Sequence, residues 1–396
     1  MNDKNKVTII LGGKIVTPFK ISRGEAVYIS NEKIMDIRNE KDIDSTKEAD
    51  IIDASDKYVV PGFIDIHMHG GGGFDAMDGN AEAIRKIAAA HSRFGTTAFL
   101  PTTMTMSRDK ITRSLKGIRK AFEEGGTAAE ILGIHMEGPY INVSRKGAQK
   151  EEEIKEASVE EFLEFEKVSG NLIRIITMAP EIPGALDFIK WLHEKGIIVS
   201  IGHTEATYEE VQESISAGAS HVTHTFNAMS GLNHRKPGVV GAALTSPELM
   251  IEMIADGVHL HPAVMKIIVR TKEMEKIILI TDAMRAAGMP DGLYELGGQE
   301  VIVADGQASL KDGTIAGSVL TLDKAVRNMV NLVGVSLPEA ARMATVNPAK
   351  RLGIEDRKGS IETGKDADIV ILDKNLEVDT TIAKGMVVYK RRWGKQ

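Results

Sequence analysis

The sequence contains no cysteine, and this absence narrows the possible chemistry. Disulfide bonds, cysteine nucleophiles and thiolate metal sites are all excluded. A bound metal ion would have to be held by histidine, aspartate or glutamate.

Long apolar runs and an excess of positive charge are also missing. Residues 1–6 are polar and charged, and no apolar stretch after them is long enough for a signal peptide or a membrane span. We therefore expect a cytoplasmic protein without a membrane partner. The formal net charge of -7 gives the chain no general attraction for nucleic acid, so a phosphate site would have to be a local feature.

Both ends of the chain are rich in short strand-like segments separated by polar turns. We expect the ends, residues 1–58 and 362–396, to combine into one small β-sandwich domain. The predicted strands cover residues 7–11, 24–29, 33–37, 367–372 and 385–389.

The middle of the chain, residues 59–361, alternates apolar strand-like runs with amphipathic helical segments such as 81–94, 109–124 and 208–217. Such alternation predicts a parallel sheet buried on both faces. A (β/α)₈ barrel fits eight strands better than an open doubly wound sheet, because no glycine-rich phosphate motif follows an early strand. The expected strands are 58–66, 97–102, 131–136, 172–178, 197–201, 221–225, 250–255 and 277–281.

Polar side chains stand at the carboxyl end of most of these strands, where barrels form their active sites. His67 and His69 are two residues apart on a strand, so both imidazoles point to the same side. Four glycines follow and let the backbone pass close to a ligand. This context favours a metal-binding pair over two rim histidines bonded to backbone.

Glu137 ends the third strand, where a buried acid needs a metal or an ion pair with Lys or Arg. The motif alone leaves both possibilities open. His203 and His224 end the fifth and sixth strands, and imidazoles with a carboxylate are the ligands expected for zinc or iron.

Asp282 follows the eighth strand, where it could exchange a proton with a water activated by the metal or could cap a helix. Its position opposite the histidines favours catalysis. His135 and His221 are expected to be structural, the first as a hydrogen-bonded core or supporting histidine and the second at the far end of the barrel.

The segment His234-Arg235-Lys236 is a short basic loop in an acidic chain, and arginine suits phosphate well. A solvated charged loop is the alternative. His259 ends the seventh strand and is expected over the barrel mouth.

These residues resemble the N-acetylglucosamine-6-phosphate deacetylases of the amidohydrolase superfamily. The matching segments are PGFIDIHMHG, HMEGPYIN, GHTEA, HTFNAMSGLNHRKPG, IADGVH, ITDAM, TIAGS and GKDADIVILD. They run from near residue 60 to beyond 370, and the combination of HxEGP, FNAM and the basic loop is far more specific than the HxH pair alone.

The resemblance implies a role for each matching residue. Glu137, His203 and His224 match the metal ligands found throughout the family, and His67 and His69 match members that hold a second metal. Asp282 matches the catalytic acid/base. The implied cofactor is one or two divalent ions, zinc or iron. Substrate contacts are implied for Ala148, Asn227, Ala228, Arg235, His259, Ile315, Ala316 and Gly317, with His234 a further candidate.

The resemblance also implies a homodimer in which each subunit donates Arg235 to the phosphate site of the other. One departure concerns Gln149, because some relatives carry a histidine near the acetyl carbonyl there. Gln149 or a second metal would have to replace it. No lysine ends the fourth strand, so Glu137 is expected to bridge two metals in place of a carboxylated lysine.

The implied reaction is hydrolysis of N-acetyl-D-glucosamine 6-phosphate to D-glucosamine 6-phosphate and acetate in amino-sugar metabolism. Two alternatives stay open. Another metal-dependent amidohydrolase or deaminase is disfavoured by the basic loop, since its substrates would carry no phosphate. A non-catalytic barrel scaffold is disfavoured by the retained ligand set and by Asp282.

Overall fold

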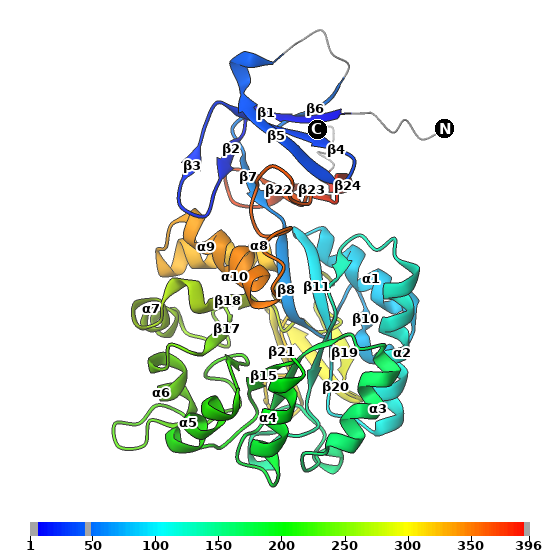
Figure 1. Cartoon of the computed structure of the whole chain (residues 1–396), viewed down its shortest axis with the longest axis vertical. Coiled ribbons are helices and arrows are strands. Elements are labelled where there is room, and N and C mark those ends of the chain that lie inside the picture. The colour runs from blue at the N-terminus through cyan, green and yellow to red at the C-terminus, as the bar shows by residue number, and fades with distance from the viewer. Residues whose placement is uncertain (1–6, 44–48, 392–396) are drawn as a thin grey trace.

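The computed structural model describes residues 7–43 and 49–391. A large barrel carries a smaller all-β part at one end, and both described chain ends lie in that smaller part (Figure 1). No helix among the described residues is long and apolar enough to cross a membrane.

The larger part is a parallel barrel of eight strands, which confirms the predicted (β/α)₈ fold. Neighbouring strands pair in the order of the chain, and the ring closes where Met68 bridges Ala283 and the Asp282 amide donates to the His67 carbonyl at 2.9 Å. The strands are β8 (Phe63–Met68), β11 (Thr96–Thr103), β13 (Ile134–Glu137), β14 (Ile173–Met178), β15 (Ile198–Ile201), β16 (His221–Val222), β17 (Met250–Ile254) and β18 (Ile277–Ile280). Short β12 (Glu130–Ile131) extends the edge beside β11.

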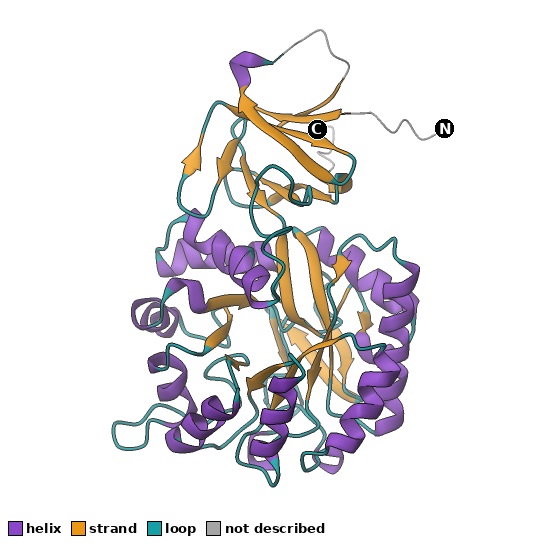
Figure 2. Ribbon diagram, in the orientation of Figure 1, coloured by secondary structure: helices purple, strands orange, loops and turns teal. Residues whose placement is uncertain are grey.

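Helices cover the outside of the barrel (Figure 2). Their starts follow from local sequence: Thr207 and Glu210 form a capping box that begins α5, and Asn80 caps α1. The helices are α1 (Ala81–Ser92), α2 (Arg108–Glu124), α3 (Val159–Ser169), α4 (Ala185–Glu194), α5 (Tyr208–Ala217), α6 (Gly238–Thr245), α7 (Pro262–Thr271), α8 (Leu322–Asn328), α9 (Leu337–Ala344) and α10 (Val346–Arg351).

The smaller part is a sandwich of two sheets that use both ends of the chain. One sheet has the order β5-β4-β1-β6 and the other β24-β23-β22-β7-β2-β3. Branched apolar side chains such as Ile29, Val59 and Ile371 fill the space between them. The strands are β1 (Val7–Leu11), β2 (Lys14–Val16), β3 (Ile21–Ser22), β4 (Glu25–Ser30), β5 (Lys33–Asn39), β6 (Ala49–Asp53), β7 (Tyr58–Pro61), β22 (Ile369–Leu372), β23 (Val378–Ala383) and β24 (Met386–Lys390).

The expected strand over residues 58–66 is two strands, and this prediction was wrong. β7 pairs with β22 in the sandwich, and β8 begins the barrel after Gly62. A Cβ at Gly62 would lie 2.2 Å from Thr97 Oγ1 and 2.9 Å from Asp368 Cβ, so only glycine fits this crossing.

The boundaries at residues 58 and 362 stay a prediction, and residues 1–6, 44–48 and 392–396 lie outside the described part. Several strands were not foreseen: β2, β3, β6 and β23, the short β9 (Gly70–Gly71) and β10 (Phe74–Asp75), and an antiparallel insertion after β18. The insertion consists of β19 (Gly292–Leu296), β20 (Gln299–Ala304) and β21 (Gln307–Ser309).

Ion pairs join the sandwich to the barrel. Lys358, whose side chain is 1% exposed, contacts Glu130 at 2.8 Å, Asp366 at 3.0 Å and also Asp368. Arg357 pairs with both Glu130 and Asp366. Because Glu130 belongs to the barrel edge and Asp366 precedes β22, these charges connect the two parts.

Candidate active site

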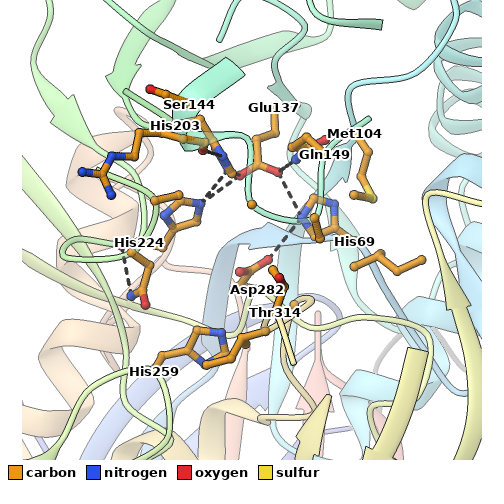
Figure 3. A pocket seen from close by; sticks show the side chains of 18 residues that line it. His69, Met104, Glu137, Ser144, Gln149, His203, His224, His259, Asp282 and Thr314 are labelled. Carbon is orange, nitrogen blue, oxygen red and sulfur yellow. Dashed lines mark hydrogen bonds and ion pairs between the residues drawn. The ribbon is translucent and has the colours of Figure 1, made fainter. Parts of the chain in front are cut away.

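A cavity of about 300 Å³ opens at the carboxyl ends of the barrel strands (Figure 3). Ligand sites of small molecules commonly begin at about this size. The lining contains His69, Met104, Glu137, Ser144, Arg145, Gly147, Ala148, Gln149, His203, His224, Asn227, Ala228, His259, Asp282, Leu296, Thr314, Ile315 and Gly317.

Three of these residues are held in an unusual backbone conformation. His203, His224 and Asp282 follow β15, β16 and β18 with φ angles of 48°, 25° and 48°. Positive φ is uncommon for residues with a Cβ and persists where surrounding contacts impose it. The fold thus accepts backbone strain at the strand ends that present these side chains to the cavity.

Glu137 stands at the centre of the cluster. Its Oε1 lies 3.2 Å from His203 Nε2 and 3.1 Å from His224 Nε2. Its Oε2 lies 3.4 Å from His69 Nε2, while His67 Nε2 is 3.5 Å from Oε1. One carboxylate therefore faces four imidazole nitrogens.

Asp282 approaches the same cluster from the opposite side of the cavity. Its Oδ1 is 3.1 Å from His69 Nε2 and 3.7 Å from His67 Nε2. No helix begins between β18 and β19 in the described chain, so the helix-cap alternative for Asp282 does not hold.

Hydrogen bonds on the outer nitrogens fix which imidazole nitrogens face the centre. Nδ1 of His67 meets Glu252 Oε2 at 2.9 Å, Nδ1 of His69 meets the Thr102 carbonyl at 3.3 Å, and Nδ1 of His203 meets the Arg145 carbonyl at 2.9 Å. These oxygens only accept, so each Nδ1 carries the proton. In the neutral ring, Nε2 then offers a lone pair to the centre.

The Nε2 atoms of His67, His69 and His203 therefore face the centre as acceptors. His203 Nε2 and His224 Nε2 lie only 3.2 Å apart, and His67 Nε2 is buried without a hydrogen-bond partner. Such a set of lone pairs and carboxylates fits divalent cations. Two of the three compact donor groups among the described residues include cavity-lining side chains, Glu137 with His203 and His224, and His67 with His69 and Asp282, whereas the third consists of His67, His135 and Glu252.

The electrostatics show that the two carboxylates at the centre favour positive charge beside them. Burial alone would raise the pKa of Glu137, but nearby His67 and His203 outweigh it and hold the pKa well below its usual value. Burial likewise acts to raise the pKa of Asp282, and the hydrogen bond from His69 helps to lower it. Both carboxylates are thus anionic at neutral pH. Among the described residues the ion-pair partners of Glu137 are histidines, so the alternative of a pair with Lys or Arg is not found.

Most of the expected substrate contacts line the cavity: Ala148, Gln149, Asn227, Ala228, His259, Ile315 and Gly317. Ala316 is fully buried beside it. His234 and Arg235 do not line the cavity of their own chain and lie on an exposed loop, residues 231–236, before α6.

Four residues near the cavity were not singled out from the sequence. Asp256 accepts from His259 Nδ1 at 2.6 Å, and Glu181 joins the Asn142 side chain to the Glu205 amide at 2.8 Å and 2.7 Å. Arg145 supplies the carbonyl that holds His203. Glu252 supports His67, and its charge within the apolar strand MIEMI was the signal that could have revealed it.

Comparisons with known proteins agree with this geometry. The model of the amidohydrolase family matches residues 58–388. The chain is 44% identical to N-acetylglucosamine-6-phosphate deacetylase of Bacillus subtilis (strain 168), covering 85% of each chain. It is 41% identical to N-acetylgalactosamine-6-phosphate deacetylase of Escherichia coli O157:H7, covering 85% of this chain and 89% of the relative. The crystal structure of N-acetylglucosamine-6-phosphate deacetylase from Pasteurella multocida superimposes with a TM-score of 0.91 at 33% identity, covering 96% of this chain and 99% of the other.

Proposed function

The chain belongs to the amidohydrolase family, and we propose that it hydrolyses N-acetyl-D-glucosamine 6-phosphate to D-glucosamine 6-phosphate and acetate. The observation that carries the proposal is the convergence of four imidazoles and Glu137 opposite Asp282 in one cavity. Relatives that match most of the chain are deacetylases of phosphorylated amino sugars.

The family depends on metal, and the donor set of this chain fits it. We infer that Glu137, His203 and His224 hold one divalent ion, and that His67 and His69 hold a second that Glu137 shares. Zinc and iron suit these ligands. When bound, such an ion polarises the amide carbonyl and lowers the pKa of water.

Asp282 performs the proton transfers in this proposal. The water oxygen forms a bond to the acetyl carbon while Asp282 Oδ1 accepts the water proton. The carbon–nitrogen bond then breaks, and Asp282 returns that proton to the departing amine. The lowered pKa of Asp282 keeps the carboxylate ionised, as a base requires.

Side chains around the cavity orient the sugar. Asn227, Ala228 and His259 line the cavity, as do Ile315 and Gly317, which belong to the segment that follows β21. Asp256 fixes His259 by accepting from its Nδ1, which leaves Nε2 for the substrate. Positioning of this kind contributes to rate by holding the acetamide near the reacting groups.

The phosphate requires positive charge that this cavity lacks. Among the described lining residues Arg145 is the one Lys or Arg, and its side chain pairs with Glu205. The exposed loop of residues 231–236 carries His234 and Arg235 away from its own cavity. We infer a homodimer in which Arg235 of each subunit binds the 6-phosphate in the other barrel.

Acetate release tests the proposed function. Metal-free protein is reconstituted with zinc or with ferrous iron and offered N-acetylglucosamine 6-phosphate, its galactose epimer, and unphosphorylated N-acetylglucosamine. We expect metal-dependent acetate release that is fastest with the first sugar. Preference for the galactose epimer would instead match the E. coli relative, and no release from either phosphate would contradict the proposal.

A further inference from the structure

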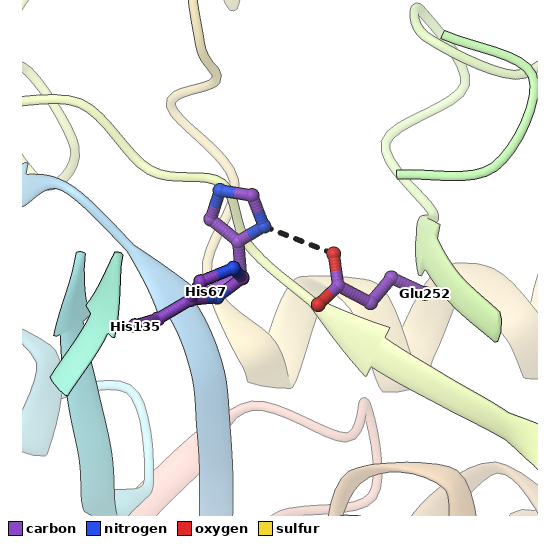
Figure 4. A group of neighbouring side chains, drawn as sticks. All are labelled: His67, His135 and Glu252. Atoms are coloured by element: carbon purple, nitrogen blue, oxygen red, sulfur yellow. Dashed lines mark hydrogen bonds and ion pairs between the residues drawn. The ribbon is translucent and has the colours of Figure 1, made fainter. Parts of the chain in front are cut away.

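Glu252 is a fully buried carboxylate in the middle of β17, an otherwise apolar strand. It is not among the residues that line the cavity. Figure 4 shows its side chain directed at His67, and the ring of His135 lies next to the ring of His67. A charge in this position is costly unless it is fully paired.

Its pairing connects both donor groups of the site. Oε2 accepts from His67 Nδ1 at 2.9 Å and from the His224 main-chain amide at 3.0 Å. Oε1 accepts from His221 Nε2 at 3.3 Å, and the Glu252 carbonyl accepts from the Thr225 amide at 3.0 Å. One residue therefore contacts an imidazole of one group and the backbone turn that presents an imidazole of the other.

We propose that Glu252 is a positioning residue that aims His67 Nε2 at the metal and fixes the turn carrying His224. This inference rests on the metal-dependent function proposed above. Glu252 touches neither substrate nor metal in this arrangement and acts through the two histidines.

The two histidines need this support for different reasons. The His67 ring can present Nε2 to a metal only if Nδ1 keeps its proton, and an acceptor on Nδ1 fixes that tautomer and makes Nε2 a stronger ligand. His224 sits at φ 25°, a strained conformation that requires an external contact to persist. The bond from its amide to Glu252 is such a contact.

His221 completes the arrangement from the other side. It is fully buried, and its bond to Oε1 fixes the carboxylate at both oxygens. The histidine expected to be merely structural thus lies one hydrogen bond away from the group that orients His67. It anchors Glu252 without contacting the cavity.

Zinc affinity of the full-length protein tests the proposal. Metal-free protein is prepared, and the zinc dissociation constant and stoichiometry are measured by competition with a chelator. Glu252→Met keeps the bulk but accepts no hydrogen bond, and Glu252→Asp keeps the charge but is one methylene shorter. We expect zinc to bind about 10–100-fold more weakly to both, the usual effect of losing a partner that orients a ligand.

Glu252→Gln shows whether the hydrogen bonds of Glu252 or its negative charge matter more. Its amide oxygen can still accept from His67 and from the His224 amide, so we expect a smaller loss than in the other two variants. Asp323→Asn on α8 is the matched control, because Asp323 is also a buried carboxylate but bonds to Thr321. Its zinc affinity should equal that of the unaltered protein.

Unaltered zinc affinity in Glu252→Met or Glu252→Asp would overturn the proposal. Should Glu252→Met not fold, Glu252→Asp decides, and far-ultraviolet circular dichroism of the metal-free proteins shows which variants fold. The proposed reaction is judged separately. If the zinc-loaded unaltered protein releases no acetate, the function fails, while the comparison of dissociation constants still decides the role of Glu252.

Discussion

Gln149 donates a hydrogen bond from its side-chain Nε2 to Oε2 of Glu137 at 2.6 Å. The Thr105 amide donates to Gln149 Oε1 at 2.8 Å, which fixes the orientation of the side-chain amide. The carbonyl and one N–H of Gln149 are therefore already bonded. The expected replacement of a histidine near the acetyl carbonyl would rely on the remaining N–H, whereas the observed contacts favour a role in holding Glu137.

Replacing Gln149 by leucine separates these two roles. The variant leaves Glu137 Oε2 without its donor, so we expect metal to bind about 10–100-fold more weakly, with a parallel loss of acetate release at low metal concentration. Chelator competition measures the affinity. If affinity is unchanged and only turnover falls, Gln149 acts on the substrate carbonyl instead.

Asp282→Asn should abolish most turnover while the substrate still binds. Asparagine keeps the shape of the side chain but cannot accept the water proton. Contributions of general acid–base groups are about 10² to 10⁴-fold, so kcat should fall by at least that order. Steady-state kinetics and binding of the intact sugar phosphate measure the two quantities. Near-normal turnover would exclude Asp282 as the acid/base.

Two histidine variants test which ligands hold which of the two proposed metal ions. His67→Ala should lower the occupancy of one ion and leave the group of Glu137, His203 and His224 loaded. His203→Ala should remove the other ion and nearly all acetate release. Elemental analysis of proteins loaded under identical conditions gives the stoichiometry. Equal metal content in both variants and the unaltered protein would contradict the assignment.

Much of the fold could be predicted because its signals are local. The boundaries of α5 and β1 match the predicted ones, and capping residues or strand alternation mark both. β23, with the sequence VDTTIA, was missed because its polar residues resemble a turn and are buried only by the strands on either side. The insertion of β19 to β21 likewise depends on pairing between strands rather than on a local pattern.

The site residues also fall into those with a local sequence signal and those whose role depends on contacts distant in sequence. His67, His69 and Glu137 could be predicted because strand periodicity and strand ends place them on one rim. Asp256 could not, since its importance lies in which imidazole nitrogen it contacts. For Glu252 the sequence offers only a charge within an apolar strand, which does not say which imidazole nitrogen it contacts. The division of the expected strand into β7 and β8 at Gly62 could not be predicted either, because it depends on contacts with Thr97 and Asp368, which are distant in sequence.

The ion pairs between sandwich and barrel predict a pH-dependent stability. Burial would raise the pKa of Asp366, but hydrogen bonds and charges from Lys33, Lys358 and Arg357 lower it to about 2. An unfolded aspartate titrates near pH 3.9. The stabilisation is therefore fully present above about pH 4 and is lost as the pH falls toward 2.

Asp366→Asn should consequently lower the free energy of unfolding at pH 7, and its difference from the unaltered protein should shrink below about pH 4. Urea denaturation of the metal-free proteins between pH 7 and pH 3 measures this difference. Asp305→Asn is the control, because Asp305 is exposed in a turn where asparagine also tolerates positive φ. A difference that does not change with pH would show that the charge of Asp366 is unimportant.

Arg235 and the proposed dimer give the last prediction. Arg235→Ala should raise KM for the phosphorylated sugar far more than for unphosphorylated N-acetylglucosamine. The loss of a charge-assisted phosphate contact costs on the order of 1.5–3 kcal/mol, or about 10- to 150-fold in KM. An equal change for both sugars would exclude Arg235 as the phosphate ligand.

A mixed dimer then shows which barrel Arg235 serves. One subunit carries Arg235→Ala and its partner carries Asp282→Asn, with different tags so that the mixed species can be isolated. If Arg235 is donated across the interface, the barrel that retains Asp282 receives an intact arginine from the partner, and one competent site survives. If Arg235 serves its own barrel, each site lacks one essential group and the mixed dimer is as inactive as its parents. About half of the unaltered activity in the mixed dimer is the expected result, because its second barrel lacks both groups.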